Sequence, residues 1–284
     1  MDAKKTEFIF YGVRGSYPVA DCKVKKYGGN TTSLLLERGE KLVLIDAGTG
    51  IINIGNHIRE KRKDIKKIDI FLTHFHIDHL QGLPFFEPCF FEEYEINIYS
   101  ASCGKSSPED TILALFNHPY SPITNQGIKA KMNFNRLDVE NRKPISLENG
   151  ITIDYIREDS HPRFGVVLYR ANIDGRSLVF STDVETPQGF KKETMNFIRG
   201  ADVLIHDSQY FDFHYNSQEY PKKGFGHSSV SMAVNNAING EVKKLFLFHY
   251  DPAYSDKEVE ALLAEARKKF KNTFLAEELK KFIL

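Results

Sequence analysis

Three histidines and one aspartate lie within six residues of this chain, and this cluster restricts the possible folds more than any other feature. They are His74, His76, Asp78 and His79. The chain holds only 10 histidines in 284 residues, so a chance grouping of loop histidines explains the cluster poorly. Residues 68–73 are mostly apolar or β-branched, which is typical of a buried strand. We therefore expect a buried strand that ends in a metal-binding loop.

The spacing inside the cluster fits two neighbouring ions. Residues two apart in an extended segment point to the same side, so His74 and His76 can bind one ion together. Asp78 and His79 follow where the chain turns, and they can face a second ion. Imidazole nitrogen and carboxylate oxygen suit zinc, manganese or iron, and the absence of cysteine ligands argues against a closed structural zinc site.

Further ligands are expected from the ends of other strands. His161, Asp183 and His249 each follow an apolar, strand-like run. Each residue taken alone is explained equally well as a hydrogen-bonded loop or core side chain. Their shared position after strands favours metal ligands, and a carboxylate at position 183 could bridge two ions.

The predicted strands and helices fall into two similar halves. Strand-like runs occupy residues 7–12, 32–37, 42–46, 68–73 and 96–100, and then 151–156, 166–171, 177–181, 203–206 and 245–248. Helical patterns occupy residues 49–62, 108–117, 188–199, 228–239 and 256–269. Two sheets packed face to face, with helices outside, would bury both halves. We predict an α/β protein with one domain over residues 1–284.

Three segments have less definite roles. Residues 103–143 include a weakly periodic stretch rich in Asn, Pro and Lys, which we interpret as a surface excursion that could act as a lid. Residues 209–226 are rich in aromatic side chains, and they could line a substrate pocket or pack over the sheet edge. Residues 84–91 are apolar, and they could pack beneath the metal site or form a homodimer contact.

The overall composition favours an ordinary cytoplasmic protein. Lys+Arg and Asp+Glu both number 38, so no net charge attracts nucleic acid or an anionic membrane, although a local basic patch is compatible with this balance. No apolar stretch approaches the ~20 residues that span a bilayer, and no signal peptide precedes the first strand. The three separated cysteines, Cys22, Cys89 and Cys103, favour a reducing compartment.

The cluster at residues 74–79, followed by His161, Asp183 and His249 in that order, resembles the metallo-β-lactamase fold superfamily. Residues 44–50 also look like the strand and turn that precede its metal loop. The resemblance implies a four-layer αββα sandwich of two mixed sheets, with the site at one sheet edge. It also implies two divalent metal ions per chain, zinc first, with iron or manganese as alternatives.

The same resemblance implies the ligand set. One ion would be held by His74, His76 and His161, the other by Asp78, His79 and His249, with Asp183 as the bridge. Asp46 would orient the metal loop rather than bind an ion.

Within the superfamily the chain looks closest to the phosphodiesterase branch that includes the tRNA 3′-processing endonucleases. Residues 201–207, 226–229 and 247–252 resemble the acidic, histidine and terminal-ligand motifs of that branch. Residues 11–16 and 27–31 add a likeness to stand-alone bacterial and archaeal hydrolases. The resemblance implies a metal-dependent hydrolase, most simply a phosphodiesterase that attacks with a metal-bridging hydroxide.

Five residues are candidates for catalysis or substrate binding. His227 could bind a non-bridging oxygen or protonate the leaving group, with Asp207 orienting it, although a turn before a helix also explains it. Asp78 is a further catalytic candidate beside its role as a ligand. Arg14 and Asn30 could contact an anionic substrate, and turn formation explains both stretches equally well.

The substrate and the rival functions are less constrained. The protruding arm with which tRNA-processing enzymes grip tRNA is not evident in residues 103–143 or 211–226. With the balanced charge, this argues for a small phosphodiester or ester as the substrate and against tRNA. The main rival is a flavin-free di-iron protein that senses oxygen or iron and signals to a partner protein, because an all-His/Asp site binds iron readily. A metal-stabilised binding module without catalysis is the third alternative.

Overall fold

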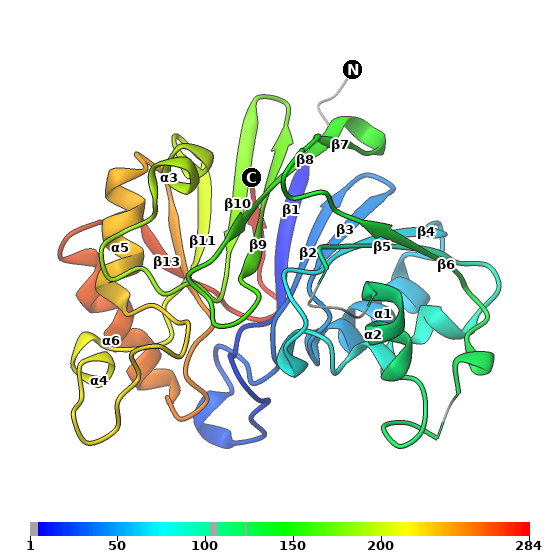
Figure 1. The fold of residues 1–284 in the computed structure, drawn as a ribbon, viewed down its shortest axis with the longest axis horizontal. Coiled ribbons are helices and arrows are strands. Elements are labelled where there is room, and N and C mark those ends of the chain that lie inside the picture. The colour runs from blue at the N-terminus through cyan, green and yellow to red at the C-terminus, as the bar shows by residue number, and fades with distance from the viewer. Residues whose placement is uncertain (1–4, 103–106, 123) are drawn as a thin grey trace.

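The computed structural model describes residues 5–102, 107–122 and 124–284. Two seven-stranded sheets pack face to face, and helices cover their outer faces (Figure 1). This arrangement confirms the predicted αββα sandwich. Cys103 and the part of the predicted excursion at 103–106 and 123 lie outside the described residues.

The first sheet has the strand order β14-β1-β2-β3-β4-β5-β6. Its strands are β1 (Thr6–Gly12), β2 (Ser33–Arg38), β3 (Lys41–Ile45), β4 (Lys67–Phe71), β5 (Glu95–Ser100), β6 (Lys131–Arg136) and β14 (Lys281–Ile283). Strands β3 to β6 run parallel. Their carboxyl ends therefore meet at one edge of the sheet.

The second sheet has the order β13-β12-β11-β10-β9-β8-β7. Its strands are β7 (Ile145–Ser146), β8 (Ile151–Glu158), β9 (Val166–Ile173), β10 (Arg176–Ser181), β11 (Val203–Asp207), β12 (Leu245–Phe248) and β13 (Thr273–Leu275). Strands β10 to β13 run parallel, whereas β7 to β10 alternate in direction.

The helices lie on the two outer faces (Figure 1). They are α1 (Gly50–Lys61), α2 (Pro108–Ala114), α3 (Lys192–Ile198), α4 (Asp212–Tyr215), α5 (Val230–Asn239) and α6 (Asp256–Arg267). Phe86 and Cys89, from the apolar run at 84–91, are buried in the same cluster as the apolar side of α1. Among the described residues, no helix combines the length and the apolar character of a bilayer-spanning segment.

The alternation of side chains along β1 divides the core in two. Phe8 and Phe10 point into the space between the sheets, where they meet Phe246 of β12 at ring-centroid distances of 5.3 and 5.8 Å. Ile9 and Tyr11 point to the opposite face and pack with the apolar side of α1. Successive strand residues point to opposite faces, so both sides of this strand are buried.

Part of the predicted excursion is sheet rather than surface loop. β6 extends the first sheet as its edge strand, pairing in parallel with β5. Its alternating polar residues weaken the sequence signal, yet they are bonded: Asn133 donates to Asn97 of β5 at 2.8 Å, and Asn97 donates to Asp69 of β4 at 2.8 Å. A row of hydrogen-bonded polar side chains across β6, β5 and β4 therefore stands where apolar side chains are expected in a strand.

Three polar residues after strands adopt left-handed backbone conformations. Asp46 follows β3 with φ 62°, Asp183 follows β10 with φ 54°, and His249 follows β12 with φ 62°. Such a conformation costs a non-glycine residue of order 1–3 kcal/mol and persists only where the surroundings enforce it. All three chain segments thus leave their strands by an abrupt turn at the same end of the sandwich.

Candidate metal centre

The candidate ligands gather where strands of both sheets end. The 74–79 cluster follows β4 of the first sheet, and His161, Asp183 and His249 follow β8, β10 and β12 of the second. These three strands share one direction, so their carboxyl ends lie at one edge. Residues up to 175 positions apart in the sequence therefore meet in one place.

The first ligand group consists of three histidines. His161 Nε2 lies 3.0 Å from His76 Nδ1, and His74 joins the same group. His74 and His161 are buried, whereas His76 is exposed. A group with two buried members and one exposed member leaves the site open on one side.

The second ligand group has the spacing of a tetrahedral metal site. His79 Nε2 and His249 Nε2 each lie 3.2 to 3.4 Å from Asp78 Oδ2 and Asp183 Oδ2. A tetrahedral ion with bonds of ~2.0–2.1 Å spaces its ligand atoms about 3.3–3.4 Å apart. All four side chains are buried. The arrangement fits one ion at their centre.

Asp183 stands between the two groups. Its Oδ1 lies 3.8 Å from His74 Nε2 and 4.0 Å from His161 Nε2, while its Oδ2 faces the second group. One carboxylate oxygen is therefore directed to each group, which is the geometry that a bridging ligand needs.

Unpartnered buried nitrogens support the presence of cations. His74 Nε2, His79 Nε2 and both ring nitrogens of His249 are buried without a hydrogen-bond partner. Buried polar atoms nearly always have a partner. Three of these atoms, the Nε2 nitrogens, face the ligand groups and fit metal ions as the missing partners.

The buried charges of the centre balance one another. Burial lowers the pKa of His79, but Asp183, Asp78 and Asp46 outweigh it and hold that pKa well above its usual value. Burial raises the pKa of Asp183, but the surrounding histidines hold it well below its usual range. Burial and the charge of His79 hold the pKa of His74 well below its usual value. The Asp78 and Asp183 carboxylates are thus ionised, whereas burial raises the pKa of Asp46, and His74 is in the neutral form that binds metals.

The outer nitrogens of two histidines are fixed by hydrogen bonds. His79 Nδ1 donates to Asp46 Oδ2 at 2.8 Å, and Asp46 Oδ1 also accepts from the Thr73 backbone N–H at 2.8 Å. His161 Nδ1 donates to the Gly226 carbonyl at 3.0 Å. Both bonds leave Nε2 directed to the centre, as outer partners of metal-bound histidines do.

Asp207 and His227 form a pair beside the second group. His227 Nδ1 donates to Asp207 Oδ2 at 2.9 Å, and the His227 ring stacks on His249 with centroids 5.1 Å apart. Burial lowers the pKa of His227, but Asp207 and then Asp183 outweigh it and raise the pKa. The predicted pairing of these two residues is present, and the same His227 nitrogen, Nδ1, lies 3.7 Å from Asp183 Oδ1.

The Arg14 and Asn30 side chains make hydrogen bonds to the loops around the centre. Arg14 is fully buried, and its guanidinium donates to the carbonyls of Gly28 at 2.9 Å and Tyr254 at 2.7 Å. The Asn30 amide donates to Glu278 at 2.9 Å and its oxygen accepts from Thr49. One guanidinium nitrogen of Arg14, Nη2, is buried without a hydrogen-bond partner, and direct substrate contact by Arg14 or Asn30 stays a prediction.

Several contributing residues were not predicted. The Ser16 backbone N–H donates to Asp78 Oδ2 at 2.8 Å, and a Cβ at Gly15 would lie 2.5 Å from the His249 ring. Glu185 accepts from the backbone N–H groups of Gly224 at 2.8 Å and Gly226 at 2.9 Å. The paired glycines before His227 were the one signal in the sequence for this contact.

The aromatic tract at 209–226 divides between two roles. Tyr210 and Tyr215 are buried, and the Tyr215 hydroxyl donates to Glu185 at 2.6 Å. Phe213, Tyr220 and Phe225 are 56–68% exposed. The tract thus packs over the sheet edge with part of its aromatic residues and presents the others to solvent.

Comparison with known proteins identifies relatives along the whole chain. Ribonuclease Z of Thermoplasma volcanium is 26% identical, with 99% of this chain and 98% of that protein covered. Ribonuclease Z of Oceanobacillus iheyensis is 27% identical, with 95% and 97% covered. The alignment with the Thermoplasma protein runs over 325 positions, more than the 284 residues of this chain. The relative therefore holds segments that have no counterpart here.

Solved structures share the fold. The metallo-β-lactamase fold protein YhfI of Bacillus subtilis superposes with a TM-score of 0.74 at 15% identity, covering 99% of this chain and 100% of that one. Human tRNase Z, short form, superposes with a TM-score of 0.67 at 19% identity, covering 97% and 98%.

These findings correct the expected partners. The full-length relatives are ribonucleases, so the argument against tRNA is wrong, and nothing supports a small-molecule substrate. The error lay in using net charge and one missing arm as evidence, because a balanced total says nothing about local cationic sites. The di-iron sensor alternative also receives no support, since the relatives are hydrolases.

The match to a family model sets the classification. The model of the beta-lactamase superfamily domain matches residues 41–250, which include every candidate ligand. This span is well over half of the chain, and the two-sheet architecture agrees with it. The chain belongs to the metallo-β-lactamase superfamily of metal-dependent hydrolases.

Proposed function

We propose that this protein is a metal-dependent ribonuclease that hydrolyses a phosphodiester bond in RNA, with precursor tRNA as the first substrate to test. The observation that carries the proposal is the placement of Asp183, whose two oxygens face two separate ligand groups. Paired sites of this kind suit in-line displacement at phosphorus. The ribonuclease Z relatives, aligned over nearly the whole chain, support RNA as the substrate class.

Seven side chains would hold two divalent ions. The first group comprises His74, His76 and His161, the second comprises Asp78, His79 and His249, and Asp183 belongs to both. When bound, the ions would supply an activated water at neutral pH and polarise the phosphoryl oxygens. The donor set of imidazoles and carboxylates suits zinc best, with manganese or iron as alternatives.

The remaining residues would orient and move protons. His227 Nδ1 donates to Asp207 Oδ2 at 2.9 Å, and this pairing with the carboxylate raises the pKa of His227, so the opposite nitrogen, Nε2, would carry the acidic proton. His227 would donate its proton to the leaving oxygen, a contribution of roughly 10²–10⁴-fold for a positioned acid. Asp78, held by the Ser16 N–H, would accept a hydrogen bond from the attacking water with its second oxygen.

The test is cleavage of a transcribed precursor tRNA with a 3′ extension, by protein loaded with zinc or manganese. We expect cleavage that Asp183→Asn abolishes and that His227→Ala lowers by at least 100-fold with unchanged metal content. Arg199→Ala, an exposed change remote from the ligands, serves as the control. Absence of cleavage of this RNA and of unstructured RNA, with two ions bound per chain, would refute the proposal.

A further inference from the structure

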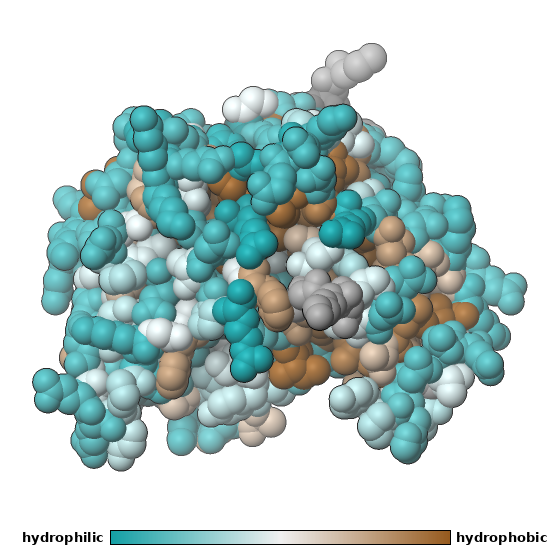
Figure 2. Space-filling model, in the orientation of Figure 1, coloured by the Kyte–Doolittle hydropathy of each residue, from teal (hydrophilic) through white to brown (hydrophobic). Residues whose placement is uncertain are grey.

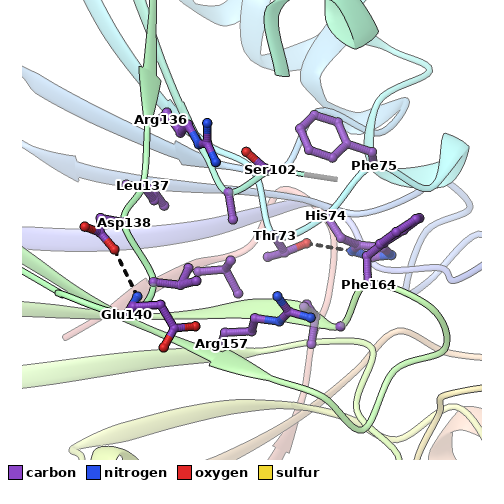
Figure 3. A pocket seen from close by; sticks show the side chains of 15 residues that line it. Thr73, His74, Phe75, Ser102, Arg136, Leu137, Asp138, Glu140, Arg157 and Phe164 are labelled. Atoms are coloured by element: carbon purple, nitrogen blue, oxygen red, sulfur yellow. Dashed lines mark hydrogen bonds between the residues drawn. The ribbon is translucent and has the colours of Figure 1, made fainter. Parts of the chain in front are cut away.

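A pocket of about 510 Å³ adjoins the metal centre and includes His74 in its wall. Its other walls come from residues 136–140 after β6, from Arg157 on β8 and from residues 164–167 (Figure 3). The loop that supplies His161 also supplies Phe164 to this pocket. In Figure 2, hydrophobic residues reach the surface mainly in the central part of this face, inside a hydrophilic rim. The volume lies within the range of small-molecule ligand sites.

Two arginines line opposite sides of the pocket (Figure 3). The Arg136 side chain makes no hydrogen bond or ion pair with any residue that the structure describes. Arg157 Nε donates to Asp159 Oδ1 at 2.9 Å, with both side chains exposed. An exposed pair of this kind is weak, and the terminal nitrogens of Arg157 stay available. Both guanidinium groups can therefore bind a phosphate from the pocket side.

An aromatic ring stands at the end nearest the metal centre. Phe164 is 49% exposed, and it lines the pocket together with His74 (Figure 3). A half-exposed ring at the rim of a polar pocket offers a face on which a nucleobase can stack, as in many sites for single-stranded nucleic acid.

Acidic residues stand at the opposite end. Asp138 Oδ1 accepts from the backbone N–H groups of Glu140 at 3.1 Å and Asn141 at 3.0 Å, so it is occupied by its own turn. The Glu140 carboxylate is exposed and has no partner among the described residues. A pocket with cations, an aromatic face and a free acceptor matches a nucleotide better than a simple anion, because a base also offers amino N–H groups.

The second basic pocket of the molecule does not share these properties. It has about 480 Å³ and is lined by Arg142, Arg170 and Arg199 among others. Arg142 pairs with Glu193, Arg199 pairs with Glu241, and Arg170 donates to the Phe197 carbonyl. Each of these arginines uses a terminal nitrogen for its partner, whereas Arg157 is bonded only through Nε. No candidate metal ligand lines this pocket, so it provides a matched control.

Building on the proposed ribonuclease function, we propose that the pocket beside His74 binds one unpaired nucleotide next to the cleaved bond of the RNA. Arg136 and Arg157 bind its phosphate, Phe164 stacks on its base, and Glu140 accepts from a base amino group. A base inside a duplex is stacked between its neighbours, so its face is not open to Phe164 and the pocket takes an unpaired nucleotide. The protein therefore selects RNA that is single-stranded at the point of cleavage.

The experiment measures binding of a fluorescein-labelled six-nucleotide single-stranded RNA by anisotropy, with EDTA-treated protein so that metal is not required. We expect Arg136→Ala and Phe164→Ala each to weaken binding by at least tenfold, and Arg136→Lys to restore part of it. Arg199→Ala should bind within twofold of the unchanged protein. Thermal unfolding and zinc content of each variant check the fold, and an unlabelled RNA duplex should compete poorly.

Each outcome bears on one proposal. If Arg136→Ala and Phe164→Ala bind the RNA as tightly as the unchanged protein, the proposed nucleotide site is refuted. It is also refuted if Arg199→Ala loses as much RNA affinity as these two variants. Effective competition by the duplex overturns the selection of an unpaired nucleotide. If the unchanged protein binds the six-nucleotide RNA through these residues but cleaves no RNA when loaded with metal, the pocket stands and the ribonuclease proposal falls.

Discussion

The Gly226 carbonyl accepts a hydrogen bond from His161 Nδ1 at 3.0 Å, although 65 residues separate the two in the sequence. Gly226 has a positive φ of 88°, and a Cβ on it would lie 2.2 Å from that same nitrogen. The bond fixes which nitrogen of His161 points to the centre. A loop of the second sheet thus sets the orientation of a candidate ligand without binding metal.

This close contact predicts that a methyl group at position 226 lowers zinc content and RNA cleavage. Gly226→Ala should displace the His161 ring and lower zinc content and RNA cleavage by at least tenfold. Gly224→Ala is the matched control, because Gly224 has φ 86° but nothing within 4 Å of its missing Cβ. Both changes strain the backbone, and only the first collides with the histidine. Equal effects of the two changes on zinc content would contradict this role.

Glu185 should support the same loop from the other side. Its carboxylate accepts from the N–H groups of Gly224 and Gly226 and from the Tyr215 hydroxyl. Glu185→Ala removes the acceptor for all three donors, and we expect faster proteolysis within residues 209–226 and weaker zinc binding. Tyr215→Phe, which removes one bond only, should have a smaller effect. Unchanged proteolysis in Glu185→Ala would show that the loop is held by its aromatic packing instead.

Asp46 should affect metal affinity through His79. Asp46→Asn keeps the size of the side chain but removes the charge that orients the His79 ring. The amide that replaces the carboxylate has one oxygen to accept from both His79 Nδ1 and the Thr73 backbone N–H. Loss of such an outer partner typically costs 10–100-fold in metal affinity or activity. Competition with a zinc chelator measures the change, with the exposed Asp21→Asn as the control. If Asp46→Asn keeps the full zinc affinity, Asp46 does not contribute to metal binding through His79.

Glu278 should make stability depend on pH. Burial raises its pKa from an ordinary value of 4.5 to about 7, despite two hydrogen bonds from Asn30. An acid whose pKa is higher in the folded state stabilises the fold fully below pH 4.5, and this contribution is lost as pH rises towards 7. The shift corresponds to on the order of 3 kcal/mol.

The measurement compares the unfolding free energy of the unchanged protein and Glu278→Gln from pH 4.5 to 8. The glutamine variant should lose less stability than the unchanged protein as pH rises, because it has no charge to bury. Parallel curves for the two proteins would show that Glu278 titrates normally in the folded state.

Residues that are local in the sequence were the easiest to predict. His74, His76, Asp78 and His79 follow one strand, so their spacing alone indicated a metal loop. His161, Asp183 and His249 could be added because each follows a strand, and parallel strands bring such ends together. The supports at Gly226 and Glu185 could not be predicted in this way, since backbone N–H and C=O groups carry no sequence signal.

Two errors have physical causes that the structure makes plain. β6 was assigned to a surface excursion because Asn133 and its neighbours replace apolar contacts with side-chain hydrogen bonds. The argument against tRNA relied on an even total of charges, although the arginines that line the pocket beside the centre, Arg136 and Arg157, stand apart from the acidic end of that pocket. The net charge is a sum over the whole surface, whereas a ligand interacts only with the charges at its own binding site.

The left-handed turns at Asp46, Asp183 and His249 limit which amino acids evolution or an engineer can place there. Aspartate, asparagine, histidine and glycine tolerate this backbone best. Glutamate could supply the same carboxylate at 183, and lysine could supply a cation at 249, yet neither suits the turn. A redesign of this centre for a different metal therefore has to change the backbone turns after β3, β10 and β12 first. Only then can other amino acids, with other donor atoms, occupy these positions.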